Sequence, residues 1–262
     1  MSALYAEPLL VTDVNECNFY HTVELPSVGL VEGKWDLRPG LDAYLSATPF
    51  EGRRVLEVGT ADGYLCFELE KRGAEVIAFD LAGGSAYDPL PLNDPGLSTV
   101  VDDMAARLQR MRNAYWLSHR LWRSRAKVVY GHIARPPDTI GQVDYCFMGN
   151  VLQHLESPLR ALAQATRLAR QGVIITEANW TTAGDQDSPL MYFLPCLRGN
   201  KPLEEWCFSW WQLTPGLVSS WLDLLGFDTV ERYEHRQFFA KIRQQVPHFT
   251  IVANRRTTSG EG

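Results

Sequence analysis

Short apolar runs alternate with segments of helical spacing along most of the chain. The apolar runs are rich in Val, Ile, Leu and Phe, and they predict strands over 54–58, 75–80, 127–131, 143–148 and 173–177. Apolar residues three and four positions apart predict helices over 41–47, 63–72, 101–123 and 215–225. Strands that alternate with helices are typical of a mostly parallel sheet with helices on both faces, so we predict an α/β fold.

The end of the chain departs from this alternation. Two predicted strands follow each other directly, over 228–236 and 247–254. We expect the first to run parallel to the others and the last to pair antiparallel with it, which completes a seven-stranded sheet. Before them, a helix should begin at Ser157 and Pro158, a capping residue followed by proline in the first turn, and end at Gly172.

Length and composition fit a single domain over 1–262. A chain of 262 residues is ample for one α/β core, and 45% apolar with 21% charged residues is ordinary for a globular protein. Two stretches without the alternating pattern, at about 82–125 and 181–212, are predicted to be insertions in this domain. No apolar run is long enough for a membrane span and no export signal is evident, so we expect a cytoplasmic protein.

Charge and cysteine usage exclude several classes of function. The net charge is −6 and the isoelectric point about 5.5, so no overall basic field attracts nucleic acid. The five cysteines are odd in number, scattered and without C-x-x-C spacing, which argues for reduced thiols and against a zinc site. We therefore expect no metal.

A glycine-bearing turn carries the most specific signal. Residues 55–63 read VLEVGTADG and residues 76–80 read VIAFD, a strand, turn and helix closed by a second strand that ends in an acid. This is one βαβ unit with a nucleoside site at the carboxyl ends of its strands. The dinucleotide fingerprint would need glycines at 61 and 64, where the chain has Ala61 and Tyr64, and Asp62 adds negative charge where a phosphate would sit. This favours a nucleoside without phosphates, commonly S-adenosylmethionine, over NAD.

Residues 55–81 resemble motif I and the second strand of class I S-adenosylmethionine-dependent methyltransferases. The resemblance implies that Gly59 and Gly63 are the loop glycines and that Asp80 holds the ribose hydroxyls of the cofactor. Asp80 follows Gly59 by 21 residues, close to the spacing of about 20 expected for a ribose-binding acid. Glu57 matches the strand-one acid that faces the methionine ammonium group. The alternatives are that Glu57 is only a strand residue and Asp80 a helix cap.

Further segments extend the resemblance over roughly residues 30–255, in the same order. They resemble a branch that includes enzymes of the tRNA wobble-uridine (carboxy)methyltransferase type, and they are GKWDLRP at 33–39, NAYWLSH at 113–119, VYGHI at 129–133, VDYCFMGNVLQHL at 143–155, SWWQLTP at 209–215 and LGF at 225–227. The implied fold is the Rossmann-like class I methyltransferase fold. Gln153 stands where the branch often has tyrosine, and His132 or the Ile133 backbone where an acid often meets adenine.

The resemblance implies a set of cofactor contacts for S-adenosyl-L-methionine and its product S-adenosyl-L-homocysteine. They are Arg38, Glu57, Gly59, Thr60, Ala61, Gly63, Asp80, Leu81, His132, Ile133, Asn150 and Val151. Arg38 could grip the methionine carboxylate of the cofactor with both arms of its guanidinium, although a plain surface arginine is the alternative. Both the ordinary cofactor and a carboxylated derivative, as in the tRNA-type relatives, stay open.

The chemistry requires little of the protein beyond positioning, because a methyl group on a sulfonium is already electrophilic. A general base is needed only if the acceptor must lose a proton, and His154 is the candidate. The alternative is that His154 serves the local hydrogen-bond network.

Aromatic residues crowd the region after the strand at 173–177. We predict substrate contacts there from Trp180, Tyr192, Trp210 and Trp211, with the two insertions forming a lid. The alternative is that these aromatic residues fill a core beneath an irregular loop. The sequence thus predicts methyl transfer to a small organic acceptor, apolar or aromatic, at oxygen or nitrogen more than at carbon. A tRNA-modifying enzyme and a cofactor-binding protein without turnover are the alternatives.

Overall fold

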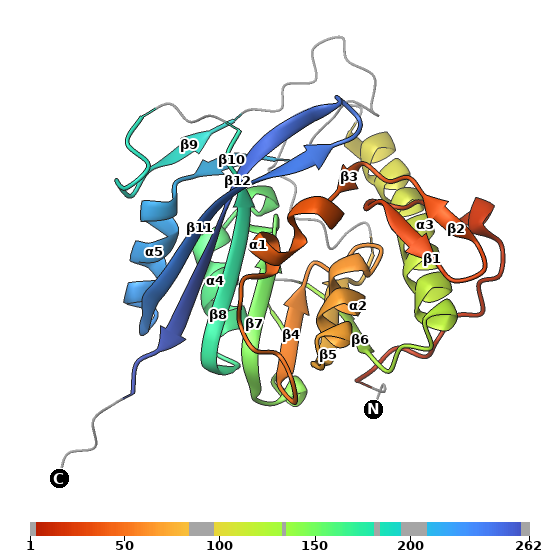
Figure 1. Ribbon diagram of the computed structural model, residues 1–262, viewed down its shortest axis with the longest axis horizontal. Coiled ribbons are helices and arrows are strands. Elements are labelled where there is room, and N and C mark those ends of the chain that lie inside the picture. Colours follow the sequence, from red (N-terminus) through yellow and green to blue (C-terminus); the bar gives the residue numbers. More distant parts are fainter. Residues whose placement is uncertain (1–3, 84–96, 133–134, 181–183, 195–208, 258–262) are drawn as a thin grey trace.

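The computed structural model describes residues 4–83, 97–132, 135–180, 184–194 and 209–257. Within them, one eight-stranded sheet has the order β3-β11-β12-β8-β7-β4-β5-β6 (Figure 1). Its strands are β3 (Trp35–Asp36), β4 (Arg54–Val58), β5 (Glu75–Leu81), β6 (Lys127–Gly131), β7 (Val143–Gly149), β8 (Ala169–Ala178), β11 (Phe227–Phe239) and β12 (Gln244–Arg255). Two small antiparallel sheets pair β1 (Val23–Leu25) with β2 (Gly29–Val31) and β9 (Met191–Phe193) with β10 (Trp211–Leu213).

Helices cover both faces of the main sheet. The α-helices are α1 (Leu41–Leu45), α2 (Tyr64–Lys71), α3 (Leu97–Leu121), α4 (Pro158–Thr166) and α5 (Pro215–Leu224), and short 3-10 helices span Val14–Glu16, Arg38–Gly40, Asp138–Ile140 and Leu152–His154. Alternate strand residues serve opposite faces, as pleating requires: Val55 packs in the core shared with α1, α2 and α3, and Leu56 in the core shared with α4 and α5. The predicted α/β fold is confirmed.

The strand directions follow the prediction. Strands β4 to β8 are parallel, and β12 lies antiparallel between β8 and β11. The strand count differs from the predicted seven because β3 adds an eighth, pairing Trp35 and Asp36 with Phe239 and Phe238 at the edge of the sheet. Two residues are too few to leave a period-two pattern in a sequence.

The predicted end of the helix after Ser157 is wrong. Helix α4 begins at Pro158 as expected, but it ends at Thr166, and Gly172 lies inside β8. The glycine is needed by the sheet: a Cβ at Gly172 would lie 2.8 Å from the carbonyl oxygen of Ala253 on β12. The side chain of Ser157 makes no capping hydrogen bond.

The N-terminal segment lies along α3 (Figure 1). The Asn18 amide donates to the carbonyl oxygen of Arg110 at 3.0 Å, and the Arg110 guanidinium donates to the carbonyl oxygens of Asn15 and Cys17 at 2.9 and 3.0 Å. This contact joins residues from two distant parts of the sequence next to the carboxyl edge of the sheet. None of the helices described is both long and apolar enough to cross a membrane.

Candidate active site

The loop between β4 and α2 is a tight turn. Gly59, Ala61 and Gly63 adopt positive φ angles of 82°, 52° and 85°. A Cβ at Gly59 would lie 2.6 Å from Cγ2 of Val151, and one at Gly63 would lie 2.5 Å from a ring carbon of Phe67. Both loop glycines are therefore required, by backbone conformation and by space.

Asp80 ties the end of β5 to this loop. Its Oδ2 accepts a hydrogen bond from the Ala61 amide and its Oδ1 from the Leu81 amide, both at 2.7 Å. Burial raises the pKa of Asp80 above its usual value, and the two amides oppose that shift. The Arg112 guanidinium donates to the carbonyl oxygen of Leu81 and stacks over Tyr130, which steadies the same edge. The carboxylate thus lies at the carboxyl ends of two neighbouring parallel strands, where such folds bind nucleosides.

Glu57 is a buried acid with an unsatisfied oxygen. The residue is 1% exposed, and its Oε2 forms no hydrogen bond within the described residues. Burial, reinforced by the charges of Asp80 and Asp62, raises the pKa of Glu57 to about 8. A buried acceptor without a partner is costly. This oxygen therefore fits a ligand that carries a cationic or hydrogen-bond-donating group near this strand end, as S-adenosylmethionine does.

Asp62 has a role that the sequence did not indicate. Its Oδ2 accepts hydrogen bonds from the amides of Tyr20 and His21 at 2.8 and 2.7 Å, and its Oδ1 lies 2.7 Å from the His21 imidazole. Both side chains are buried. The carboxylate therefore fastens the N-terminal segment to the loop between β4 and α2.

A hydrogen-bond network holds the turn after β7. Asn150, at a positive φ of 55°, accepts from the Ala178 amide at 2.7 Å, and its amide nitrogen lies 3.1 Å from Nε2 of His248. Glu177 Oε1 accepts from the amides of Val151 and Leu152 at 3.0 and 2.8 Å. These bonds fix the turn that packs against Gly59. Glu177 and His248 were not predicted from the sequence. The only sequence signal for Glu177 is its place directly after the run VIIT, at the end of a predicted strand.

Of the remaining residues predicted to contact the cofactor, Arg38 and His132 have partners within the protein, and Ile133 is not among the described residues. Arg38 donates to both oxygens of Asp36 at 2.8 Å, and this ion pair is partly exposed. His132 follows β6 and its carbonyl oxygen accepts from the Arg135 amide at 2.7 Å. Ile133 lies outside the described residues. The cofactor roles assigned to Arg38 and His132 stay predictions.

A group of aromatic side chains, here called the aromatic wall, lies at the carboxyl edge of the sheet. We use this name for Trp35 on β3, Trp180 after β8 and Phe239 on β11. Trp35 stacks on Phe239 with ring centroids 4.4 Å apart, and Trp180 lies 6.0 Å from each of them. Gln153 Oε1 accepts from the Trp180 indole at 3.1 Å, and Gln212 Oε1 from its backbone amide at 2.7 Å. Trp180 is nevertheless 40% exposed, so the wall presents an aromatic face.

Comparison with known proteins decides the family. A model of the methyltransferase domain matches residues 36–240. The chain belongs to the methyltransferase domain family. The match confirms the predicted class of enzyme and its cofactor, S-adenosylmethionine. A search of curated proteins gave no match.

Solved structures share the fold of this methyltransferase at low sequence identity. The N-terminal domain of EvdMO1 with S-adenosylhomocysteine bound is 17% identical, with 90% of each chain covered and a TM-score of 0.57. A protein of Bacillus halodurans that is provisionally assigned as a methyltransferase is 13% identical. The match covers 85% of this chain and 99% of that protein, with a TM-score of 0.51. A similarly provisional RNA methyltransferase from Pyrococcus horikoshii is 12% identical over 84% and 80%, with a TM-score of 0.50.

The other predicted aromatic residues of the methyltransferase have partners of their own. Trp210 is 3% exposed, and its amide donates to the Gln153 carbonyl oxygen at 2.8 Å. The Trp211 indole donates to the carbonyl oxygen of Leu155 at 2.8 Å and its ring lies against Phe193. Tyr192 lies on β9, paired with Gln212 of β10. Trp210 and Trp211 thus have packing contacts, while Trp180 belongs to the aromatic wall.

His154 ends the 3-10 helix Leu152–His154, and its Nδ1 lies 3.4 Å from the Ser209 hydroxyl. Its role as a base stays a prediction. No group of three or more potential metal ligands occurs in the part of the chain that the structure describes.

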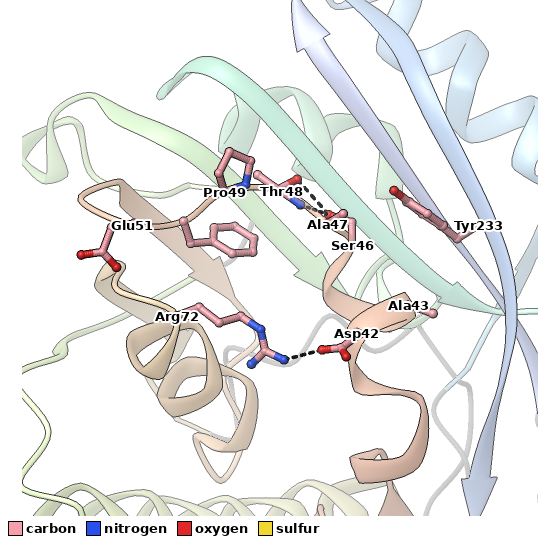
Figure 2. Close-up of a pocket in the computed structure, with 10 residues that line it drawn as sticks. Asp42, Ala43, Ser46, Ala47, Thr48, Pro49, Glu51, Arg72 and Tyr233 are labelled. Carbon is pink, nitrogen blue, oxygen red and sulfur yellow. Dashed lines mark hydrogen bonds and ion pairs between the residues drawn. The ribbon is translucent and has the colours of Figure 1, made fainter.

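A pocket of the methyltransferase lies between α1, the loop 46–51 and β11, with no residue of the loop at 59–63 in its lining (Figure 2). The loop 46–51 leads into the amino end of β4, and Arg72, just past the end of α2, pairs with Asp42 at 2.8 Å. Tyr233 of β11 completes the lining. Class I sheets bind ligands at the carboxyl ends of their strands, so this pocket is not the active site.

Proposed function

We propose that this methyltransferase moves a methyl group from S-adenosylmethionine to a small organic acceptor with an apolar or aromatic surface. Transfer to oxygen or nitrogen is favoured over transfer to carbon. The aromatic wall carries the proposal, because Trp180 presents an exposed indole after β8, at the carboxyl edge that also holds the loop at 59–63. Aromatic side chains of this kind bind planar or apolar groups and attract a sulfonium through cation–π contact.

The cofactor contacts belong to the same proposal. Asp80 would accept the ribose hydroxyls, while Glu57 would face the methionine ammonium group. Val151 would lie against the adenine, next to Gly59. When bound, the cofactor supplies an electrophilic methyl group, so the chain's own residues have to orient the acceptor and exclude water. Positioning of this kind can lower a barrier by about 7–11 kcal/mol.

His154 is the proposed base for acceptors that lose a proton. It follows β7 at the carboxyl edge of the sheet, beside the Gln153 side chain that holds Trp180. A base adds about 10²–10⁴-fold to the rate only where a proton must leave. We further propose that the chain is one domain and that the insertions at about 82–125 and 181–212 close over the acceptor.

The test compares two aromatic truncations. Trp180→Ala should lower methyl transfer to an acceptor found by screening with labelled cofactor, and leave the affinity for S-adenosylhomocysteine within about twofold. Tyr233→Ala is the matched control, because Tyr233 lines the pocket beside the loop 46–51 and lies outside the aromatic wall and both insertions. Failure of the parent protein to bind S-adenosylhomocysteine or S-adenosylmethionine in calorimetry would refute the proposed function.

A tRNA acceptor is the second candidate, favoured by the resemblance to the wobble-uridine branch. The net charge of −6 weighs against it. Salt-dependent binding of tRNA, with methylation of the bound RNA, would select this alternative.

A further inference from the structure

The side chain of Gln153 lies beside the aromatic wall in a fixed orientation. The residue is 4% exposed, and its Oε1 accepts a hydrogen bond from the Trp180 indole at 3.1 Å. An indole N–H can only donate, so the oxygen of the Gln153 amide has to face Trp180. The NH2 group is bonded to the same carbon as this oxygen, and it therefore also lies close to the indole.

The NH2 group of Gln153 has no hydrogen-bond partner within the described residues. A glutamine amide carries two donor hydrogens, and a donor on a nearly buried side chain is costly to leave unpaired. A bound molecule that supplies an acceptor oxygen would remove this cost. The unpaired donor therefore points to a ligand group beside Trp180.

Hydrogen bonds from neighbouring segments hold Gln153 and Trp180 in place. The Gln153 carbonyl oxygen accepts from the Trp210 amide at 2.8 Å, and the Trp180 amide donates to Oε1 of Gln212 at 2.7 Å. Gln212 is 1% exposed and donates in turn to Oδ1 of Asn179 at 2.9 Å. The Gln153 amide and the Trp180 indole are consequently positioned before any ligand binds, which lowers the entropy cost of binding.

The indole donors of the aromatic wall are already occupied. Trp35 donates to the Tyr20 hydroxyl at 3.2 Å, and Trp180 donates to Gln153. The side chain of Phe239 has no polar atom. A molecule that lies on the aromatic wall therefore meets the rings without meeting an available indole N–H, and the Gln153 NH2 group supplies a donor at their border.

We propose that Gln153 determines acceptor specificity: its NH2 group donates to a carbonyl or similar oxygen of a planar acceptor whose ring lies on Trp180. This inference rests on the proposed function and narrows it to planar molecules that carry such an oxygen at the edge of the ring. Ring stacking and one hydrogen bond together fix the orientation of the molecule. They therefore also determine which of its atoms faces the methyl donor.

Two probes that differ only in a carbonyl group test the proposal. Indanone and indane share one fused bicycle, and indane has a methylene group where indanone has its carbonyl. Their affinities are measured by ligand-observed NMR titration with the methyltransferase saturated in S-adenosylhomocysteine, so that the cofactor site is filled. Gln153→Met, which keeps the length of the side chain without the amide, should weaken indanone about fivefold relative to indane, the scale of one neutral hydrogen bond.

Further variants separate the amide from the ring. Trp180→Phe removes the indole N–H and leaves the Gln153 NH2 group, so the ratio of the two affinities should stay as in the parent. Trp180→Ala should weaken both probes. Gln164→Met, the same substitution on α4 and outside the aromatic wall and both insertions, should change neither. Loss of the parent ratio in Trp180→Phe would assign the carbonyl to the indole N–H and overturn the role of Gln153.

One reading needs no variant. In the parent protein, indanone should shift the side-chain NH2 resonance of Gln153 in the amide NMR spectrum more than indane does. The proposal is overturned if the parent binds no indanone, if both probes shift this resonance equally, or if folded Gln153→Met keeps the parent ratio.

Cofactor binding is measured separately. If S-adenosylhomocysteine binds and Gln153→Met leaves the ratio unchanged, the specificity role of Gln153 is wrong while the methyltransferase function stands. If S-adenosylhomocysteine does not bind, the proposed function itself fails.

Discussion

The Asp62 carboxylate lies 2.7 Å from the His21 imidazole, with both side chains almost completely buried. The same carboxylate accepts hydrogen bonds from the Tyr20 and His21 amides. One acid in the glycine-bearing loop therefore anchors a segment about 40 residues earlier in the chain. The stability of the cofactor loop and the placement of the N-terminal segment are consequently linked.

Asp62→Ala is expected to destabilise the protein and loosen this segment. Each buried amide left without an acceptor costs about 1–3 kcal/mol. Denaturant unfolding should show the loss, and limited proteolysis should cut before β3 faster than in the parent. Asp62→Asn, which keeps an acceptor oxygen, should be milder, and the exposed Asp103→Ala should be silent. Equal stability of Asp62→Ala and the parent would remove the proposed anchor.

Asp80→Ala is expected to weaken the affinity for S-adenosylhomocysteine by roughly 1–3 kcal/mol, the scale of a lost charged hydrogen bond. Isothermal calorimetry measures the change directly. Because Asp80 also accepts from the Ala61 and Leu81 amides, the melting temperature of the variant should be measured without ligand, to show that the variant is folded at the temperature of the calorimetry. An unaltered affinity would refute the ribose assignment.

Gly59→Ala and Gly52→Ala form a matched pair. Both positions have positive φ, so an alanine costs about 1–2 kcal/mol of backbone strain in either place. A Cβ at Gly52 meets nothing within 4 Å, whereas one at Gly59 meets Val151. Only Gly59→Ala should therefore lose cofactor affinity, and adding Val151→Ala should restore part of the stability. Thermal melting and calorimetry on the two single variants and the double variant provide the check; identical behaviour of the two alanines would contradict the contact.

Glu177 should give the protein a measurable pH dependence. Burial raises its pKa from 4.5 to about 8 in the folded state. Between those values the unfolded chain holds fewer protons at this site than the folded chain, so the site's contribution to stability falls as the pH rises. Glu177→Gln keeps an acceptor for the Val151 and Leu152 amides and removes the titration.

The melting temperatures of parent and Glu177→Gln should accordingly be similar near about pH 5 and differ near about pH 8, with the variant higher. Glu75→Gln serves as the control, since the Glu75 side chain is 59% exposed. A difference that does not grow with pH would mean that Glu177 is ionised in the folded protein.

Local signals explain which parts of the fold were predictable. The bounds of β4 and β6 match the prediction because each strand is a compact apolar run next to turn residues. The loop at 59–63 could be predicted because its glycines are visible in the sequence. The structure requires them there, for positive φ angles and for close approach to side chains. The predicted strand began at residue 173, whereas β8 begins at Ala169. A glycine at 172 is typical of a helix end, but it is equally compatible with a strand that packs closely against Ala253.

The aromatic wall was harder to predict because its parts are far apart in the sequence. Trp180 was expected, but Trp35 and Phe239 meet it only through a two-residue strand. Trp210 was expected at the substrate, and nothing in the pattern of a dense aromatic run separates a buried indole from an exposed one.

The stacking of Trp35 on Phe239 also sets an order of events during synthesis. The strands from β4 to β8 and the loop at 59–63 leave the ribosome well before Phe239 does. The aromatic wall has to wait for nearly the last residues. A chain interrupted before β11 would therefore carry the loop at 59–63 without the aromatic wall that we propose to hold the acceptor.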